Sequence, residues 1–250
     1  MSEQHEIALP DATRAEDALS SACPDSSALA GDPTLVYGVD EAGRGPWLGP
    51  MAMAVVVVNS VSARALEQLG VQDSKRFGSD ARGRAKRAEL AEAIRACVVD
   101  HRCALVDVEE IDQHTFRGQL NHLERLVVTR LLGARELAAE VDARIICDGA
   151  RLFSPLKRRY PGLIAVDKGE SAHVAVAAAS VLAKHARDEA FAAIATKYEP
   201  EFGPITGGGY VNAATRAFLT AYEQRHGGLP PEARKSWGAR KRKPEQLPLA

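Results

Sequence analysis

Apolar residues fall in two kinds of run along the chain, and together they predict an α/β protein. Short runs rich in β-branched residues predict strands at 34–40, 50–59, 102–108, 144–148 and 163–166. The run at 50–59 is apolar at nearly every position, which is typical of a strand buried on both faces. Apolar residues at helical spacing predict helices at 80–99, 119–139, 172–197 and 213–225. Asn212 is the expected N-cap of the last helix.

Charge divides the chain of 250 residues into an acidic start and a mildly basic body. Residues 1–33 hold seven acidic residues and one arginine, a net −6, which leaves +5 for the rest of a chain whose net charge is −1. Their Ser, Ala, Asp, Glu and Pro content predicts a disordered extension. Residues 240–250 lack a core-forming pattern, so we expect a disordered basic tail. A basic body fits a nucleic-acid partner without demanding one. On the predicted helix 80–99, we expect the basic residues to lie on the exposed face: Arg82, Arg84, Lys86 and Arg87.

The compartment follows from what the chain lacks. No apolar run is long enough to span a bilayer, so we expect no membrane association. The first residues are acidic and polar, which is not the pattern of a secretory signal. We therefore expect a cytoplasmic protein.

Two adjacent carboxylates, Asp40 and Glu41, follow the first predicted strand and precede a turn of Gly43, Arg44 and Gly45. Successive side chains of a strand point to opposite faces, so both carboxylates serve one site only if the strand ends or twists there. Glycines permit such a turn and leave backbone N–H groups free to approach a phosphate or a sugar. The stretch predicts a site for a metal ion and a nucleic-acid backbone.

Two further carboxylates could complete this site. Asp148 ends a predicted strand, where ligand sites of α/β sheets gather, although an Asp-Gly pair alone is more typical of a turn. Asp188 follows Lys184 by four residues on the helix 172–197, where a surface ion pair is the simpler interpretation. Four carboxylates without a zinc-spaced Cys/His set favour Mg²⁺ or Mn²⁺, and two such ions can flank a phosphodiester. Neither a P-loop nor a dinucleotide-binding motif is present.

The order of these motifs resembles type 2 ribonuclease H (RNase HII) over residues 35–243. The resemblance rests on four segments: Asp40 to Pro46 with Gly49 and Pro50, Asp73-Ser74-Lys75, Asp148-Gly149, and Ala177 to Asp188. The C-terminal third is similar to the archaeal and eukaryotic branch, so we expect an archaeal-like subtype. Residues that carry this likeness include Gly209, Tyr210, His226, Gly227, Arg234 and Trp237.

The resemblance implies a ribonuclease H-like fold, a central mixed β-sheet flanked by helices, with a small helical C-terminal region. We therefore divide the chain into an extension (1–33), a catalytic domain (34–200), a substrate-binding region (201–239) and a tail (240–250). A monomer is expected. The implied activity is cleavage of the RNA strand of RNA–DNA hybrids and incision 5′ of single ribonucleotides in duplex DNA, leaving 5′-phosphate ends. Ribonucleotide excision repair and primer removal would use it.

The resemblance also implies residue roles. Asp40, Glu41, Asp148 and Asp188 would form the catalytic set that holds Mg²⁺ or Mn²⁺. The main chain of Gly43, Arg44 and Gly45 would contact the 2′-hydroxyl, and Tyr210 would pack on the same sugar. Lys75 would hold a phosphate of the DNA. Two departures from the family pattern, at Glu170 and at Val211 with Asn212, leave local roles there open.

Other functions fit parts of the sequence. A junction resolvase would use carboxylates too, but it gives no reason for the turn of Gly43, Arg44 and Gly45. A nucleic-acid-binding adaptor without catalysis is the alternative from another class. In the tail, Gln246, Leu247, Pro248 and Leu249 resemble the short peptide with which bacterial proteins dock on the sliding clamp, although a chance match is at least as plausible.

Overall fold

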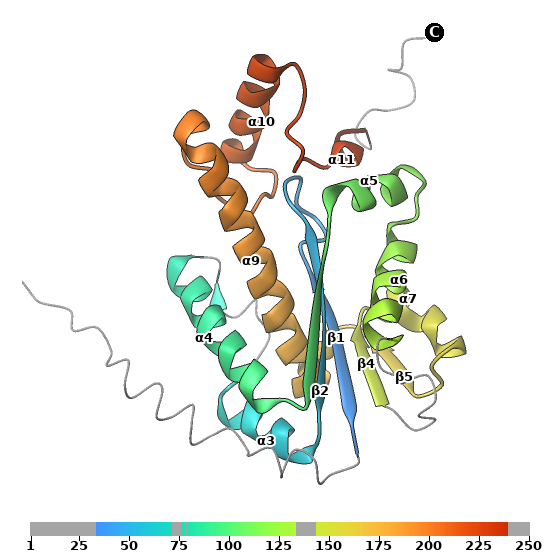
Figure 1. Cartoon of the computed structure of the whole chain (residues 1–250). Helices are drawn as coiled ribbons and strands as arrows, with labels where there is room; N and C mark the ends of the chain where they lie inside the picture. The colour runs from blue at the N-terminus through green and yellow to red at the C-terminus, as the bar shows by residue number, and fades with distance from the viewer. Residues whose placement is uncertain (1–33, 72–76, 79, 134–143, 240–250) are drawn as a thin grey trace, which may run out of the picture.

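A five-stranded mixed sheet forms the centre of the molecule, in the order β3-β2-β1-β4-β5 (Figure 1). The computed structural model describes residues 34–71, 77–78, 80–133 and 144–239. β1 (Val36–Ala42) is antiparallel to β2 (Met51–Val58), which is antiparallel to β3 (Asp100–Val106). On its other side β1 runs parallel to β4 (Arg144–Asp148), and β4 runs parallel to β5 (Leu163–Val166). All five predicted strands are confirmed, and the mixed sheet is the one the resemblance implied.

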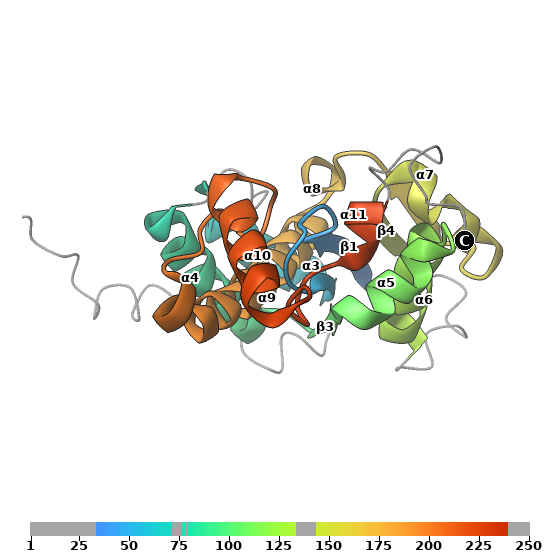
Figure 2. The same cartoon turned by 90° about the horizontal axis from the view of Figure 1, so that it is seen from above.

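Helices cover both faces of this sheet (Figures 1 and 2). One face carries α3 (Ser60–Gln68), α4 (Ala81–Cys97) and the long α9 (Val174–Phe202). The other carries α5 (Val108–Phe116), α6 (Leu120–Gly133) and α7 (Ala150–Phe153), which continues into η3 (Ser154–Arg158). The short α8 (Gly169–Ala172) precedes α9, whereas α10 (Ala213–His226) and α11 (Lys235–Ala239) lie beyond one end of the sheet.

The central strand β2 is buried on both faces, as its continuous apolar run predicted. Met51, Met53, Val55 and Val57 belong to the core between the sheet and α5 and α6. The alternate residues, including Ala52 and Ala54, belong to the core beneath α4 and α9. Alanines on both β2 and α9 let the helix approach the sheet closely. At Gly38 of β1, an added Cβ would lie 2.1 Å from the carbonyl carbon of Ala175.

A third core joins the end of α9 to α10. Leu48, Tyr198 and Phe218 are buried in it, so the β1–β2 connection packs against the C-terminal helices. Asn212 caps α10 through a hydrogen bond from the Thr215 N–H, as predicted. Helix α9 continues through residue 200, where the predicted catalytic domain ends and the predicted substrate-binding region begins. The boundary between these two regions stays a prediction. The extension at 1–33 and the tail at 240–250 lie outside the described residues.

Helices α3 and α5 are the longest of the described helices that were not predicted from the sequence. Helix α3 begins at a reciprocal cap, in which Asn59 accepts the Ser62 N–H and the Ser62 hydroxyl accepts the Asn59 N–H. Helix α5 begins after its N-cap Asp107, so β3 ends at Val106 and not at the predicted residue 108. The predicted helix 119–139 is described as far as Gly133. Within the described part of the chain, no helix is both long enough and apolar enough to cross a membrane.

Candidate active site

Strand β1 carries Asp40 and Glu41 without a break. Asp40 pairs with Ala54 of β2 and Glu41 with Met53, and the strand continues to Ala42. The strand therefore does not end between the two carboxylates, and alternation directs Asp40 toward α9 and Glu41 toward α6. Asp40 is only 5% exposed, and its Oδ1 accepts the Glu41 N–H at 2.8 Å.

Negative charge accumulates around Glu41. The pKa of this carboxyl is raised to about 8, chiefly by burial and then by the neighbouring carboxylates Asp40, Glu124 and Asp148, with only Arg44 opposing the shift. Carboxylates that share a site repel one another, and a divalent cation relieves that repulsion. The electrostatics of this end of β1 therefore favour a bound cation.

Asp148 reaches the same place because β4 is parallel to β1. Cys147 pairs with Val39, so Asp148 lies beside Asp40 at the carboxyl ends of both strands. Its Oδ1 accepts the Gly169 N–H at 3.0 Å, which ties the carboxylate to the start of α8. The strand register therefore places Asp148 next to Asp40.

Asp188 stands on α9, where two cations contact it. Arg87 of α4 donates hydrogen bonds from Nε and Nη2 to Oδ2, at 3.0 Å and 2.7 Å, and Lys184 donates to Oδ1. The Arg87 side chain is 1% exposed, so the prediction that it lies on the exposed face of its helix is wrong. Burial lowers the pKa of Lys184, and hydrogen bonding to Asp188 opposes the shift. The Lys184–Asp188 pair is therefore half-buried, not a surface ion pair.

Glu41 interacts electrostatically with Asp40 and Asp148, whereas the hydrogen bonds of Asp188 go to Arg87 and Lys184, so the four carboxylates do not form a closed ligand set. Among the described residues, no three acidic, histidine or cysteine side chains converge tightly enough to hold an ion. Their chemistry nevertheless suits a hard cation, since all of the donors are carboxylate oxygens.

The turn of Gly43, Arg44 and Gly45 (the 43–45 turn) lies against a buried arginine of α9. A Cβ on Gly43, where φ is +81°, would lie 2.7 Å from Cδ of Arg187. Arg187 Nη2 donates to the carbonyls of Leu48 and Gly208, at 2.6 Å and 3.0 Å. Arg187 thereby links the β1–β2 connection to the loop that carries Tyr210.

Tyr210 borders the 43–45 turn. A Cβ on Gly45 would lie 3.3 Å from Cε1 of the Tyr210 ring, and the tyrosine is 54% exposed. Trp47 N–H donates to the carbonyl of Gly209 at 2.8 Å, which holds the two loops together. The exposed ring and the turn expected to act with it are therefore neighbours.

The Arg44 side chain contacts α6. Its Nε donates to Oε1 of Glu124 at 2.8 Å, and its Nη2 to Oδ1 of Asn121 at 2.5 Å. Sequence reasoning missed Glu124, which is fully buried and whose pKa burial raises while Arg44 opposes the shift. Its position four residues after Leu120, on the apolar face of α6, could have indicated a buried charge.

A cavity of about 510 Å³ adjoins these side chains, lined by Arg44, Gly45, Gly118, Leu120, Asn121 and Trp237.

Some predicted residues cannot be placed. Lys75, with Asp73 and Ser74, lies outside the described residues, as do Gln246, Leu247, Pro248 and Leu249.

A mixed five-stranded sheet flanked by helices, with carboxylates at the ends of two adjacent parallel strands, defines a ribonuclease H-like nuclease. The family model of ribonuclease HII matches residues 37–240, and the chain belongs to that family, as the motifs predicted. It is therefore a metal-dependent ribonuclease H, a hydrolase that cuts the RNA strand of RNA–DNA hybrids.

Curated relatives and solved structures agree with this placement. Ribonuclease HII of Thermococcus sibiricus is 34% identical over 217 residues, which cover 84% of this chain and 91% of that protein. Ribonuclease HII of Pyrococcus furiosus is 32% identical over 213 residues, 81% of this chain and 88% of that protein. The crystal structure of ribonuclease H2 from Pyrococcus horikoshii OT3 has a TM-score of 0.67 at 30% identity, and the match covers 83% of this chain and 96% of that one. These archaeal relatives agree with the predicted archaeal-like subtype.

Proposed function

We propose that this enzyme incises duplex DNA on the 5′ side of a single embedded ribonucleotide, in addition to cutting longer hybrids. The cellular roles would be ribonucleotide excision repair and removal of RNA primers. One observation carries the proposal: the 43–45 turn begins two residues after Glu41, and the exposed ring of Tyr210 borders it. Chemistry and sugar recognition would thus be coupled within one short stretch of backbone.

Recognition of the ribose would use the main chain of the 43–45 turn. The 2′-hydroxyl distinguishes RNA from DNA, and it can both donate and accept a hydrogen bond. Backbone N–H groups of Arg44 and Gly45 would contact it while the Tyr210 ring packs on the sugar. A side chain at Gly45 would intrude between the turn and this ring. Lys75 would hold a phosphate of the DNA.

Asp40, Glu41, Asp148 and Asp188 would hold Mg²⁺ or Mn²⁺. The repulsion that raises the pKa of Glu41 supports this assignment, as does the exclusive use of oxygen donors. When bound, two such ions would supply an activated water and neutralise charge on the leaving oxygen. Arg87 would orient Asp188 through its two hydrogen bonds.

The reaction is a hydrolysis at phosphorus. The oxygen of water bonds to the phosphorus 5′ of the ribonucleotide, and the bond from phosphorus to the 3′ oxygen of the upstream nucleotide breaks. The 3′ oxygen gains a proton, so the products end in a 3′-hydroxyl and a 5′-phosphate. The chain's own part is to align the phosphate by gripping the ribose beside it.

A sliding clamp is the proposed protein partner. The structure of the PCNA:RNase HII complex from Archaeoglobus fulgidus contains a chain similar to this one, with a TM-score of 0.64 at 25% identity over 85% of this chain and 100% of that one. Gln246, Leu247, Pro248 and Leu249 would dock on the clamp. Deletion of residues 244–250 should abolish clamp binding, and unchanged binding would contradict the assignment. We also propose that the enzyme works in the cytoplasm as a monomer.

The experiment that tests this function compares two duplexes of the same sequence, one with a single ribonucleotide and one of DNA alone. With Mg²⁺ or Mn²⁺, the enzyme should cut only the first. Equal cutting of both would indicate a general nuclease, such as a junction resolvase. Cutting of neither duplex would contradict the proposed incision at single ribonucleotides and leave only the cleavage of longer hybrids.

A further inference from the structure

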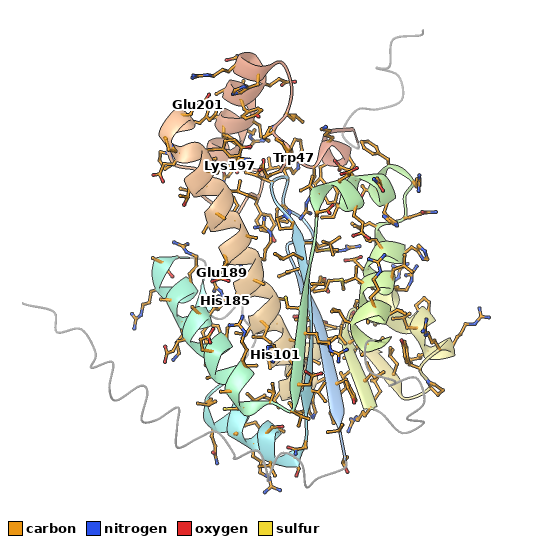
Figure 3. The ribbon with its side chains drawn as sticks, in the orientation of Figure 1. Trp47, His101, His185, Glu189, Lys197 and Glu201 are labelled. Carbon is orange, nitrogen blue, oxygen red and sulfur yellow. The ribbon has the colours of Figure 1, made fainter. Side chains whose placement is uncertain are left out.

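We infer that Arg234 and Trp237 are positioning residues for ribose recognition, because they hold the 43–45 turn in one orientation. The inference rests on the proposed function. Arg234 immediately precedes α11 and Trp237 lies within it, so both belong to a C-terminal segment far along the chain from the turn. Figure 2 shows the β1–β2 connection lying between α10 and α11, and Figure 3 places Trp47 of that connection at the same end of the sheet.

Four backbone carbonyls of the turn region accept hydrogen bonds from this segment. Arg234 donates from Nη2 to Gly43 at 2.6 Å, from Nη1 to Arg44 at 3.0 Å and from Nε to Gly49 at 3.0 Å. Trp237 donates from Nε1 to the carbonyl of Gly45 at 3.1 Å. Every carbonyl of the 43–45 turn is therefore directed at Arg234 or Trp237.

The direction of these carbonyls fixes the direction of the turn's N–H groups. In a trans peptide unit the C=O and the following N–H point in opposite directions, and the described residues contain no cis peptide. Because the Gly43 and Arg44 carbonyls face Arg234, the N–H groups of Arg44 and Gly45 face away from it. These are the two N–H groups that would read the 2′-hydroxyl. The bonds behind the turn thus present its donors to the sugar.

An arginine suits this position because its planar guanidinium carries donors in a fixed fork. A lysine would have to reach these carbonyls from one ammonium nitrogen, whereas arginine uses three separate nitrogens. Arg234 is 2% exposed, and burial, together with nearby Arg187, lowers its pKa to about 9, with Asp112 opposing the shift. A buried charge is costly unless its hydrogen bonds are made, so the three contacts stabilise one arrangement of the turn. The guanidinium carbon also lies 5.0 Å from the ring centroid of Trp237.

The segment is itself anchored, so it can act as a fixed support. Buried Asp112 of α5 accepts hydrogen bonds from the backbone N–H groups of Lys235 and Ser236, at 2.9 Å and 3.0 Å, and from the Ser236 hydroxyl. On the other side, the Arg234 N–H donates to the carbonyl of Trp47 at 2.8 Å. Contacts of Arg234 itself and of the two residues after it thereby fix the position of the segment relative to the turn.

Trp237→Phe and Arg234→Lys test the inference through binding, not cleavage. The measurement is fluorescence anisotropy with EDTA present, on a duplex with one ribonucleotide and on the all-DNA duplex of the same sequence. The wild type should prefer the ribonucleotide. Removing one hydrogen bond should reduce that preference by about 3-fold to 10-fold in Trp237→Phe, and Arg234→Lys should reduce it further. Affinity for the all-DNA duplex should stay near wild type, because phosphate contacts dominate it.

Arg225→Ala is the matched control, since Arg225 belongs to the same C-terminal region and contacts Glu201 instead of the turn. It should keep the wild-type preference. A wild-type preference in folded Trp237→Phe, or an equal loss of affinity for both duplexes, would overturn the inference. Trp237→Phe decides the matter if Arg234→Lys does not fold. If the wild type binds both duplexes equally, the inference is overturned but the proposed function is not. The proposed function fails only if the ribonucleotide duplex is not selectively cut.

Discussion

Arg87 of α4 and Asp188 of α9 form an ion pair in which one guanidinium donates twice to a single carboxylate oxygen, at 3.0 Å and 2.7 Å. The pair joins two helices on the same face of the sheet, and the arginine is 1% exposed. Its third contact, from Nη1 to the carbonyl of Gly78 at 2.5 Å, fixes the chain just before α4. A carboxylate assigned to catalysis therefore also contributes to the packing of α4 on α9.

Arg87→Met should destabilise the fold, because it removes all three hydrogen bonds of the guanidinium while keeping the apolar stem. Breaking a largely buried pair by removing one partner predicts a loss of about 3 kcal/mol in the free energy of unfolding. Urea denaturation measures it. Arg82→Met, on the exposed side of the same helix, is the control and should change stability by less than about 0.5 kcal/mol. Similar values for the two variants would show that the pair adds nothing to the fold.

Gly38→Ala should prevent normal packing of α9 on the sheet. The added carbon would lie within 2.4 Å of three backbone atoms of Ala175 and Val176, and backbone cannot move aside as a side chain can. We expect at least about 3 kcal/mol of destabilisation, at the upper end for overpacked cores. Thermal unfolding measures it, with Gly133→Ala as the control, because none of the described residues lies within 4 Å of a Cβ there. A Gly38→Ala protein as stable as this control would contradict the close helix–sheet contact.

His173 should make stability fall at acidic pH. Its Nδ1 accepts the Ala175 N–H at 3.1 Å and caps α9, which requires an unprotonated nitrogen. Burial, and then Arg144, lowers the His173 pKa from 6.5. The unfolded chain thus binds the proton more readily, so the stabilisation is complete above pH 6.5 and is lost as pH falls below it.

His173→Asn provides the measurement, because asparagine caps helices without titrating in this range. Unfolding free energies at pH 7.5 and 5.5 should show a larger acid loss in the wild type, by up to about 1 kcal/mol, the usual contribution of a cap. Comparing the two proteins cancels the other titrating groups they share. An identical pH dependence would show that the cap does not depend on protonation of this histidine.

Asp40→Asn should abolish cleavage while the protein stays folded. The amide has nearly the same shape but carries no charge to attract a cation, and it removes part of the repulsion that raises the pKa of Glu41. The control is Glu92→Gln, which also replaces a carboxylate with an uncharged amide but does so on the exposed face of α4. This variant should cut at the wild-type rate. Circular dichroism checks both folds. A near wild-type rate in Asp40→Asn would remove Asp40 from the metal site.

The sequence predicted the elements whose pattern is local. Strand β2 could be recognised because eight consecutive apolar residues allow few other structures, and the carboxylates of β1 and β4 stand out beside turns. Family resemblance supplied the grouping of Asp40, Asp148 and Asp188, which no local pattern provides. The parallel register of β1 and β4 then explains physically why two of them are neighbours.

Buried charges were not predicted, because their partners lie far away in the chain. Arg87 was assigned to the exposed face, although it stands three residues before Leu90 and seven before Ile94 on the buried side of α4. Glu124 and Arg234 were overlooked as contributors to the site for the same reason: their hydrogen-bonding partners are 80 and 190 positions away. Charged residues on an apolar helix face, read as candidates for buried pairs, would have indicated Arg87 and Glu124.

The central claim is that one site both reads a ribose and cuts beside it, and the position of the cut tests this most directly. Two duplexes of identical sequence would carry their single ribonucleotide at positions two nucleotides apart, with the products mapped at single-nucleotide resolution. The account predicts one cut per duplex, on the 5′ side of the ribonucleotide, that moves by the same two nucleotides and leaves a 3′-hydroxyl and a 5′-phosphate. A cut that stays in place when the ribonucleotide moves would contradict it.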